Sequence, residues 1–241
     1  HTTSNDDVNL TMSISSDMGT LTFGDQMASA TDRADNIVSL SLFECCTWAA
    51  TLMDGMGGTN GQYHDGDNFD GSTNEGFEYT APSMNGWTLR LSHQPTADRA
   101  SEGAEDSNQA AISGSIAGIS VAAGINSMGD AATGTAGRDS TFVAGSMGLG
   151  PMSVSVGMFE GGSNAADATT IVVDMPIAGM NGKAAFVDMD DAGGYDDSGY
   201  RLGLAKSLGA ATFGIEYDNA DTASGDAGEI ETWRVGYQVY F

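Results

Sequence analysis

The last stretch of the chain, Glu-Thr-Trp-Arg-Val-Gly-Tyr-Gln-Val-Tyr-Phe at residues 231–241, decides the fold. Polar or small residues fill most of its even positions, and large apolar residues fill the odd ones, namely Trp233, Val235, Tyr237, Val239 and Phe241. Because side chains alternate between the two faces of a strand, this pattern predicts a β-strand with one aromatic face and one polar face. A strand at the edge of a soluble domain and a strand in contact with lipid both fit it.

The same alternation recurs along the whole chain in stretches of about 7 to 11 residues. Tight Gly-rich turns join the stretches in pairs, and longer segments rich in Asp, Gly, Ser and Asn separate one pair from the next. This rhythm is typical of an antiparallel up-and-down barrel. With the last strand, the predicted strands number about thirteen, and the pairs are 8–15 with 20–25, 75–81 with 87–94, 109–116 with 119–126, 141–147 with 152–159, 169–175 with 183–189 (turning at 176–182), and 198–206 with 211–218.

The composition narrows the class of protein. No run in the 241 residues approaches the roughly 18 apolar residues that a membrane helix needs, whereas 34 glycines and 4 prolines suit short strands and tight turns. The formal net charge of −25, from 33 acidic against 8 basic residues, argues against a nucleic-acid partner. Such acidity fits a secreted or surface protein, attraction of cations, a salt-adapted organism, or simply well-solvated loops.

Signatures of catalysis are missing from the sequence. Cys45 and Cys46 are adjacent, which is outside ordinary disulfide geometry, so we expect free thiols or packing residues. The three histidines have no zinc-ligand spacing, and there is neither a G-x-S-x-G elbow nor a phosphate-binding glycine loop. We therefore predict that the protein is not an enzyme and requires no cofactor.

Three stretches in this order and at these distances resemble Gram-negative outer-membrane general porins of the alphaproteobacterial or related type. They are 18–26, a strand leading into a long loop; 78–87, a Tyr-Thr-Ala-Pro hairpin that follows it; and 237–241, a closing strand. The resemblance implies an all-β, sixteen-stranded transmembrane barrel, assembled as a homotrimer in the outer membrane. It also implies that the barrel-assembly machinery reads the terminal Tyr237, Val239 and Phe241.

The first few strands of that barrel are expected to be missing. Bacterial barrels have even strand numbers, and about thirteen strands would leave about three unaccounted for. The chain also starts at His1, without a Met or a signal-peptide pattern, so either a signal was removed or an amino-terminal part is absent.

One connection, residues 27–74, is far longer than the others within the single predicted domain 1–241. Loops of such length are usually functional or disordered, and the porin resemblance implies a constriction loop folded into the lumen. Its first part carries an apolar patch at 37–49 that could anchor it to the inner wall or to a neighbouring subunit, and its second part is polar and acidic.

A pore needs opposed charges at its narrowest point. Arginine is costly on a lipid face, so in a barrel the arginines on the polar faces of strands point into the lumen. The alternative is that some of them lie near a rim and bridge to loops. We predict a constriction with Arg90, Arg201 and Arg234 on its basic side and Glu44, Asp54 and Glu216 on its acidic side.

The segment 65–71 superficially suggests a calcium loop through Asp65, Asp67 and Asp70. An EF-hand needs Glu at its twelfth position, which here is Gly76. Asp65, Asp67 and Asp70 remain weak candidates for binding Ca²⁺, and a solvated acidic loop is the alternative.

These observations predict a water-filled channel for passive diffusion of ions and small hydrophilic solutes. The implied partners are further copies of the chain, membrane lipid, lipopolysaccharide and the assembly machinery. Outer faces rich in Ala, Gly and Val, such as those of 109–116 and 119–126, are candidates for the contact between subunits. The alternative is a soluble, secreted, calcium-binding acidic adhesin, which would need no detergent for extraction and would respond to chelators.

Overall fold

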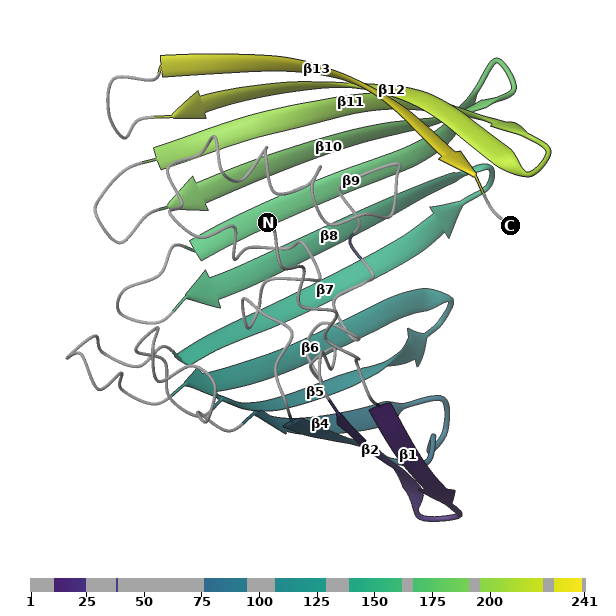
Figure 1. Cartoon of the computed structure of the whole chain (residues 1–241). Helices are drawn as coiled ribbons and strands as arrows, with labels where there is room; N and C mark the ends of the chain where they lie inside the picture. The colour runs from purple at the N-terminus through teal and green to yellow at the C-terminus, as the bar shows by residue number, and fades with distance from the viewer. Residues whose placement is uncertain are drawn as a thin grey trace, which may run out of the picture.

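The computed structural model describes residues 11–24, 38, 76–94, 107–128, 139–161, 167–190, 196–222 and 228–239. They form one antiparallel sheet of thirteen strands in which each strand pairs with the next along the chain. The predicted all-β up-and-down architecture is thereby confirmed (Figure 1). The strands are β1 (Thr11–Ser16), β2 (Gly19–Gly24), β3 (Gly76–Thr80), β4 (Thr88–Gln94), β5 (Ser107–Ile116), β6 (Ile119–Met128), β7 (Asp139–Leu149), β8 (Met152–Gly161), β9 (Asp167–Ile177), β10 (Met180–Asp190), β11 (Asp196–Leu208), β12 (Ala211–Thr222) and β13 (Gly228–Val239).

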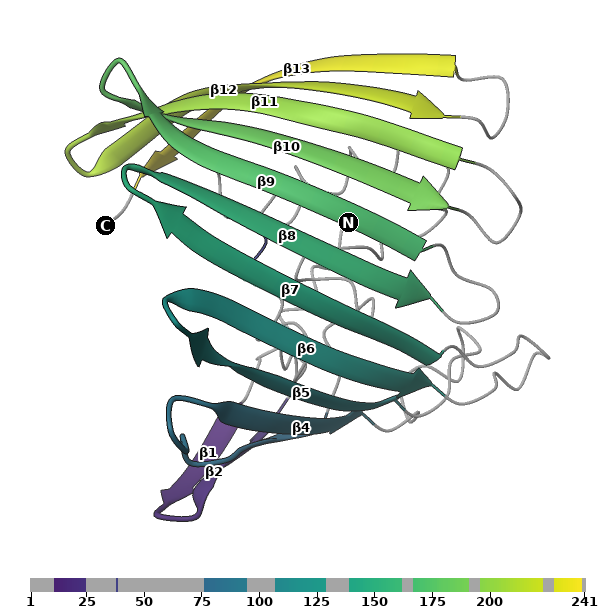
Figure 2. The same cartoon turned by 180° about the vertical axis from the view of Figure 1, so that it is seen from behind.

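The sheet curves strongly around one side, and the strands run obliquely across it (Figures 1 and 2). β1 and β13 form its two edges. Short turns gather at one end of the strands, which we call the turn end. The longer connections, including 25–75, join strands whose ends meet at the opposite end, the loop end. Among the residues that the structure describes, none belongs to a helix able to cross a membrane.

Two-residue turns hold several hairpins in register. Ala117 and Gly118 have φ of 52° and 83°, and Ala178 and Gly179 have φ of 51° and 76°. Positive φ at both central residues defines the type I′ turn, whose twist matches that of paired strands. The register of β5–β6 therefore continues to the pair Ile116–Ile119 at the turn itself.

The predicted turn at 176–182 is wrong. β9 runs to Ile177 and β10 starts at Met180, so only Ala178 and Gly179 turn. The proline at 176 suggested an early end to the strand, because proline cannot donate to a ladder hydrogen bond. In the structure Pro176 lies opposite Asn181, one residue before the end of β9, where a single missing donor is tolerated.

A lumen wall of charged side chains

The distribution of polar and apolar side chains between inside and outside is the reverse of that in a soluble protein. The concave inner face buries polar side chains, while the outer face exposes large apolar ones, among them Val143 and Leu202 with exposed fractions of 56% and 49%. A soluble domain hides its large apolar side chains, whereas a barrel in lipid turns them outward. The buried polar residues are Glu78, Ser92, Gln109, Asn126, Ser140, Ser155, Thr170, Arg201, Glu216 and Asp218.

The apolar outer belt has the height of a membrane. On β11 it begins at Lys206 near the turn end, continues through Leu204, Leu202 and Tyr200, and ends at Ser198. Ser198 lies between Asp188 and Asp221 in a polar row. Eight residues separate Lys206 from Ser198, which is about 27 Å along a strand. At a strand tilt of about 35–45° this length spans a height of roughly 20 Å, and the exposed Leu208 beyond Lys206 extends the apolar surface toward the roughly 25 Å band of outer-membrane barrels.

One register row carries polar side chains across five strands of the inner face. Ser92 pairs with Glu78 and with Gln109, and Asn126 pairs with Gln109 and with Ser140. All five side chains are buried. The sequence gives no sign of this row, because its five residues are far apart along the chain and only the pairing of the strands aligns them.

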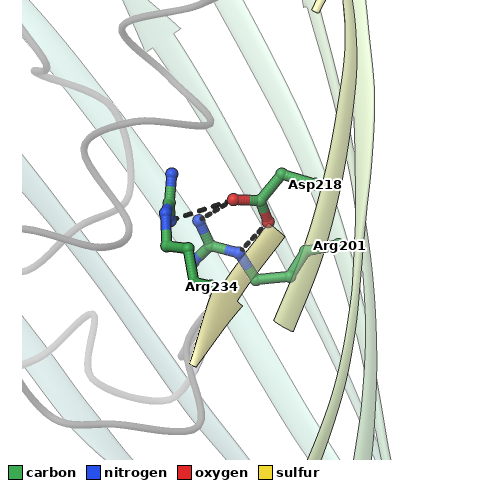
Figure 3. A network of polar contacts seen from close by, with 3 residues as sticks. All are labelled: Arg201, Asp218 and Arg234. Atoms are coloured by element: carbon green, nitrogen blue, oxygen red, sulfur yellow. Dashed lines mark hydrogen bonds and ion pairs between the residues drawn. The ribbon is translucent and has the colours of Figure 1, made fainter. Parts of the chain in front are cut away.

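A second inner-face cluster joins β11, β12 and β13 (Figure 3). Arg201 donates two hydrogen bonds to Asp218, from Nε to Oδ1 at 2.6 Å and from Nη2 to Oδ2 at 3.3 Å. Arg234 Nη1 approaches the Oδ2 atom of the same carboxylate at 2.9 Å. Forked pairing of this kind fixes the guanidinium geometrically as well as electrostatically.

The row next to this cluster is also charged. Glu216 lies directly opposite Arg234 on β13 and opposite Gly203 on β11, and its side chain is buried. Beyond Gly203 the row continues with Lys183 of β10, whose Nζ is 3.4 Å from Asp174 of β9. Acidic and basic side chains therefore alternate along the lumen wall from β9 to β13.

The structure brings together three of the six predicted constriction residues, Arg201, Arg234 and Glu216. Arg90 lies on the inner face of β4, where its Nη1 donates to Ser113 Oγ at 2.9 Å, and β5 to β10 separate it from the cluster. Glu44 and Asp54 lie outside the described residues. The prediction missed Asp218, although its alternation with Glu216 on the polar face of β12 was a usable signal.

The other predicted residues have simpler outcomes. Tyr237 and Val239 lie exposed on β13, and Phe241 falls outside the described residues. Asp65, Asp67 and Asp70 also lie outside them. Within the part of the chain that the structure does describe, no group of three or more potential metal ligands occurs.

An apolar patch on the inner wall lies between the two polar regions. Its members include Phe142, Phe159, Val172 and Val187, which belong to one buried cluster. Val38, the single described residue of the long connection, belongs to the same cluster and has an exposed fraction of 4%. The connection therefore touches the inner-face cluster at this point.

Comparison with solved structures gives the same architecture. The chain superposes on a porin refined at 1.8 Å resolution with a TM-score of 0.70 and 17% identity, over 96% of this chain and 80% of that one. For an anion-selective porin from Comamonas acidovorans the TM-score is 0.65 and the identity 16%, over 96% and 76% of the two chains. For outer-membrane expressed OmpT of Vibrio cholerae the TM-score is 0.62 and the identity 15%, over 97% and 80%.

No curated protein matches the sequence. A sequence profile of the family described as Gram-negative porin matches residues 1–239, which is nearly the whole chain. That match agrees with the reversed polarity and with the height of the apolar belt, and it does not favour a soluble adhesin. The chain therefore belongs to the Gram-negative porin family and is an outer-membrane β-barrel channel protein.

Proposed function

We propose that the protein is a passive diffusion channel for ions and small hydrophilic solutes with a weak preference for cations. The observation that carries the proposal is the reversed polarity, with charged side chains on the inner wall and an apolar belt outside. Family and fold suggest a channel rather than an enzyme. No chemical step is needed, since solutes move down their own gradients.

The narrow part of this channel is formed by the charged cluster of β11–β13 on one side and by residues 27–74 on the other. Two findings support this proposal. Arg201, Arg234, Glu216 and Asp218 converge on one patch of the inner wall. The buried position of Val38 in the inner-wall cluster is what a loop anchored inside the barrel would produce.

A weak rather than strong selectivity follows from the balance of charges. The described inner wall carries Arg90, Lys183, Arg201 and Arg234 against Glu78, Asp174, Glu216 and Asp218. The four positive and four negative charges cancel, so the net negative charge of the whole chain determines that cations are preferred over anions. Removing a single charge from the inner wall should therefore change the preference for cations over anions measurably.

We expect Arg234→Gln to raise the cation-to-anion permeability ratio about two- to fivefold. A unit charge about 8 Å from a permeating ion in water contributes roughly 0.5 kcal/mol, with opposite signs for a cation and an anion, so the ratio changes by at most about fivefold and by less after screening by salt. Arg234→Gln removes this charge from beside Glu216 and Asp218. The measurement is the reversal potential of single channels in a planar bilayer under a salt gradient. Glu216→Gln should shift the reversal potential in the opposite direction.

Lys206→Gln is the matched control, because it removes the same charge from the outer face of β11. It should leave the reversal potential nearly unchanged. Equal shifts from Arg234→Gln and Lys206→Gln would show that net charge alone sets selectivity. Folded, inserted protein without any conductance would contradict the channel proposal itself.

We also propose a homotrimer whose subunits meet through the outer faces of β5 to β7. That surface is aliphatic, with Ile112, Ala123, Ile125 and Val143, whereas the outer faces of β10 to β13 carry most of the aromatic side chains. Small side chains such as Ala123 permit close packing between barrels, while aromatic side chains suit lipid and its interfaces.

Ala123→Phe should therefore weaken the trimer. Overpacking a close interface costs about 1–3 kcal/mol per site, so unheated protein in SDS should lose its trimer band at a lower temperature than the wild type. The same substitution at Ala184, on the outer face of β10, should leave the trimer intact. An unaltered trimer in the Ala123→Phe variant would place the contact elsewhere.

A further inference from the structure

A groove of about 430 Å³ crosses the outer face of β9 to β13. Its volume lies within the range of small-molecule sites. The side chains that border it include Met175, Ile177, Leu202, Leu204, Tyr217 and Trp233.

The groove exists because the outer face of β10 carries small residues here. Gly182 lies directly between Met175 and Leu204 in the register, and Ala184 occupies the next position on that face. A Cβ added to Gly182 would lie 2.5 Å from Ile177 Cδ1, so the side chain of Ile177 lies over this glycine and forms part of the groove's lining. The larger side chains of β9 and β11 therefore border a depression above the small residues of β10.

One basic side chain of the outer face, Lys206, lies just beyond the turn end of this groove in the part of the chain that the structure describes. Lys206 follows Leu204 on the same face of β11, and its Nζ donates to the carbonyl oxygen of Gly179, in the turn directly after Ile177. That bond uses one of the three N–H donors of an ammonium group. A lysine so placed extends its aliphatic stem along apolar surface and holds its charge at the edge of the membrane.

No acidic side chain of the described residues lies on the outer face at this end. On the outer faces of β9 to β13, the described carboxylates all lie toward the loop end, at Asp167, Asp188, Asp190, Asp221 and Glu231. The turn end is therefore locally positive on a chain whose net charge is −25. It complements an anionic group at the membrane surface.

We propose that this groove binds one anionic phospholipid, with an acyl chain over Ala184 and against Ile177, and with the phosphate at Lys206. The proposal specifies which membrane lipid the protein binds and where, and it rests on the barrel lying in a bilayer. An apolar groove that opens onto the belt, with a cation just beyond its turn end, matches a molecule with an apolar chain and an anionic head. A second copy of the protein would instead bring its own apolar belt against Lys206.

Native mass spectrometry of the detergent-extracted protein tests the proposal, with phosphatidylglycerol and phosphatidylcholine as probes. We expect one phosphatidylglycerol to be retained per subunit at concentrations where phosphatidylcholine is not. Lys206→Gln should reduce this preference about fivefold, the effect of one basic residue at an anionic surface, and Lys206→Arg should retain it. Equal retention of both lipids, or an unchanged preference in Lys206→Gln, would overturn the assignment of the headgroup.

Ala184→Phe tests the acyl-chain half of the site, with Ala123→Phe on the outer face of β6 as its matched control. The first variant should lose the retained lipid, and the second should keep it on every subunit. Equal loss in both would mean a nonspecific lipid shell. Dissociation of the trimer by Ala184→Phe would show that the groove is a subunit contact, and the proposal would be wrong. None of these outcomes depends on conductance, so they are independent of the test of the channel.

Discussion

Replacing Leu202 with arginine is expected to destabilise the folded barrel by about 2–4 kcal/mol, the cost of a basic side chain at the middle of a lipid-facing surface. Leu202 is 49% exposed on the outer face of β11, two positions from each of Leu204 and Tyr200 on that face. At this depth a guanidinium meets neither water nor an acidic partner. The measurement is the free energy of unfolding by urea in lipid vesicles.

Leu208→Arg is the control for depth. Leu208 lies on the same face of the same strand, at the turn end beyond Lys206, and is 61% exposed. There the same substitution should cost only about 0–1 kcal/mol, because the side chain reaches the interface. Similar losses for Leu202→Arg and Leu208→Arg would contradict the position of the apolar belt.

The second large effect is expected for Arg201→Met. Its two bonds to Asp218 are buried, and losing one partner of a buried ion pair typically costs about 3–5 kcal/mol. Arg234 still contacts Asp218 Oδ2 and should keep the loss toward the lower end of that range. The same unfolding experiment measures it.

Arg90→Met is the comparison, because Arg90 is only partly buried and donates a hydrogen bond to the neutral hydroxyl of Ser113. It should cost about 1 kcal/mol. The double variant Arg201→Met, Asp218→Asn should recover part of the loss, since the buried carboxylate that has lost one of its two arginine partners is then neutral. Additive effects of the two substitutions would mean that the pair is not coupled.

The strands and their faces could be predicted from the sequence because alternation is a local property. In a strand such as 198–206, the outer face can be identified from Tyr200, Leu202 and Leu204 without knowing which strands lie beside it. The prediction erred where local signals conflicted, as at Pro176, whose missing donor was outweighed by the Ala178-Gly179 turn.

The candidate site was only partly predictable. Arg201, Arg234 and Glu216 were recognised as inward-facing because arginine avoids lipid, yet nothing in their spacing showed that Arg201 and Arg234 would share Asp218. The pairing of Arg201 with Asp218 depends on the register of β11 against β12, which the turn at Gly209 and Ala210 sets. The polar row from Glu78 to Ser140 depends on four successive registers.

By itself the sequence determined the fold class, the succession of strands, the face that each strand turns to lipid and the porin resemblance, because these depend on neighbours along the chain. Only the tertiary structure decided which charges meet on the lumen wall, that Val38 joins the inner-wall cluster, and that a groove ending at Lys206 crosses the outer face. The physical reason is that such groupings form across strands, between residues far apart in sequence. Small shifts in register would move each side chain to a different neighbour or to the opposite face.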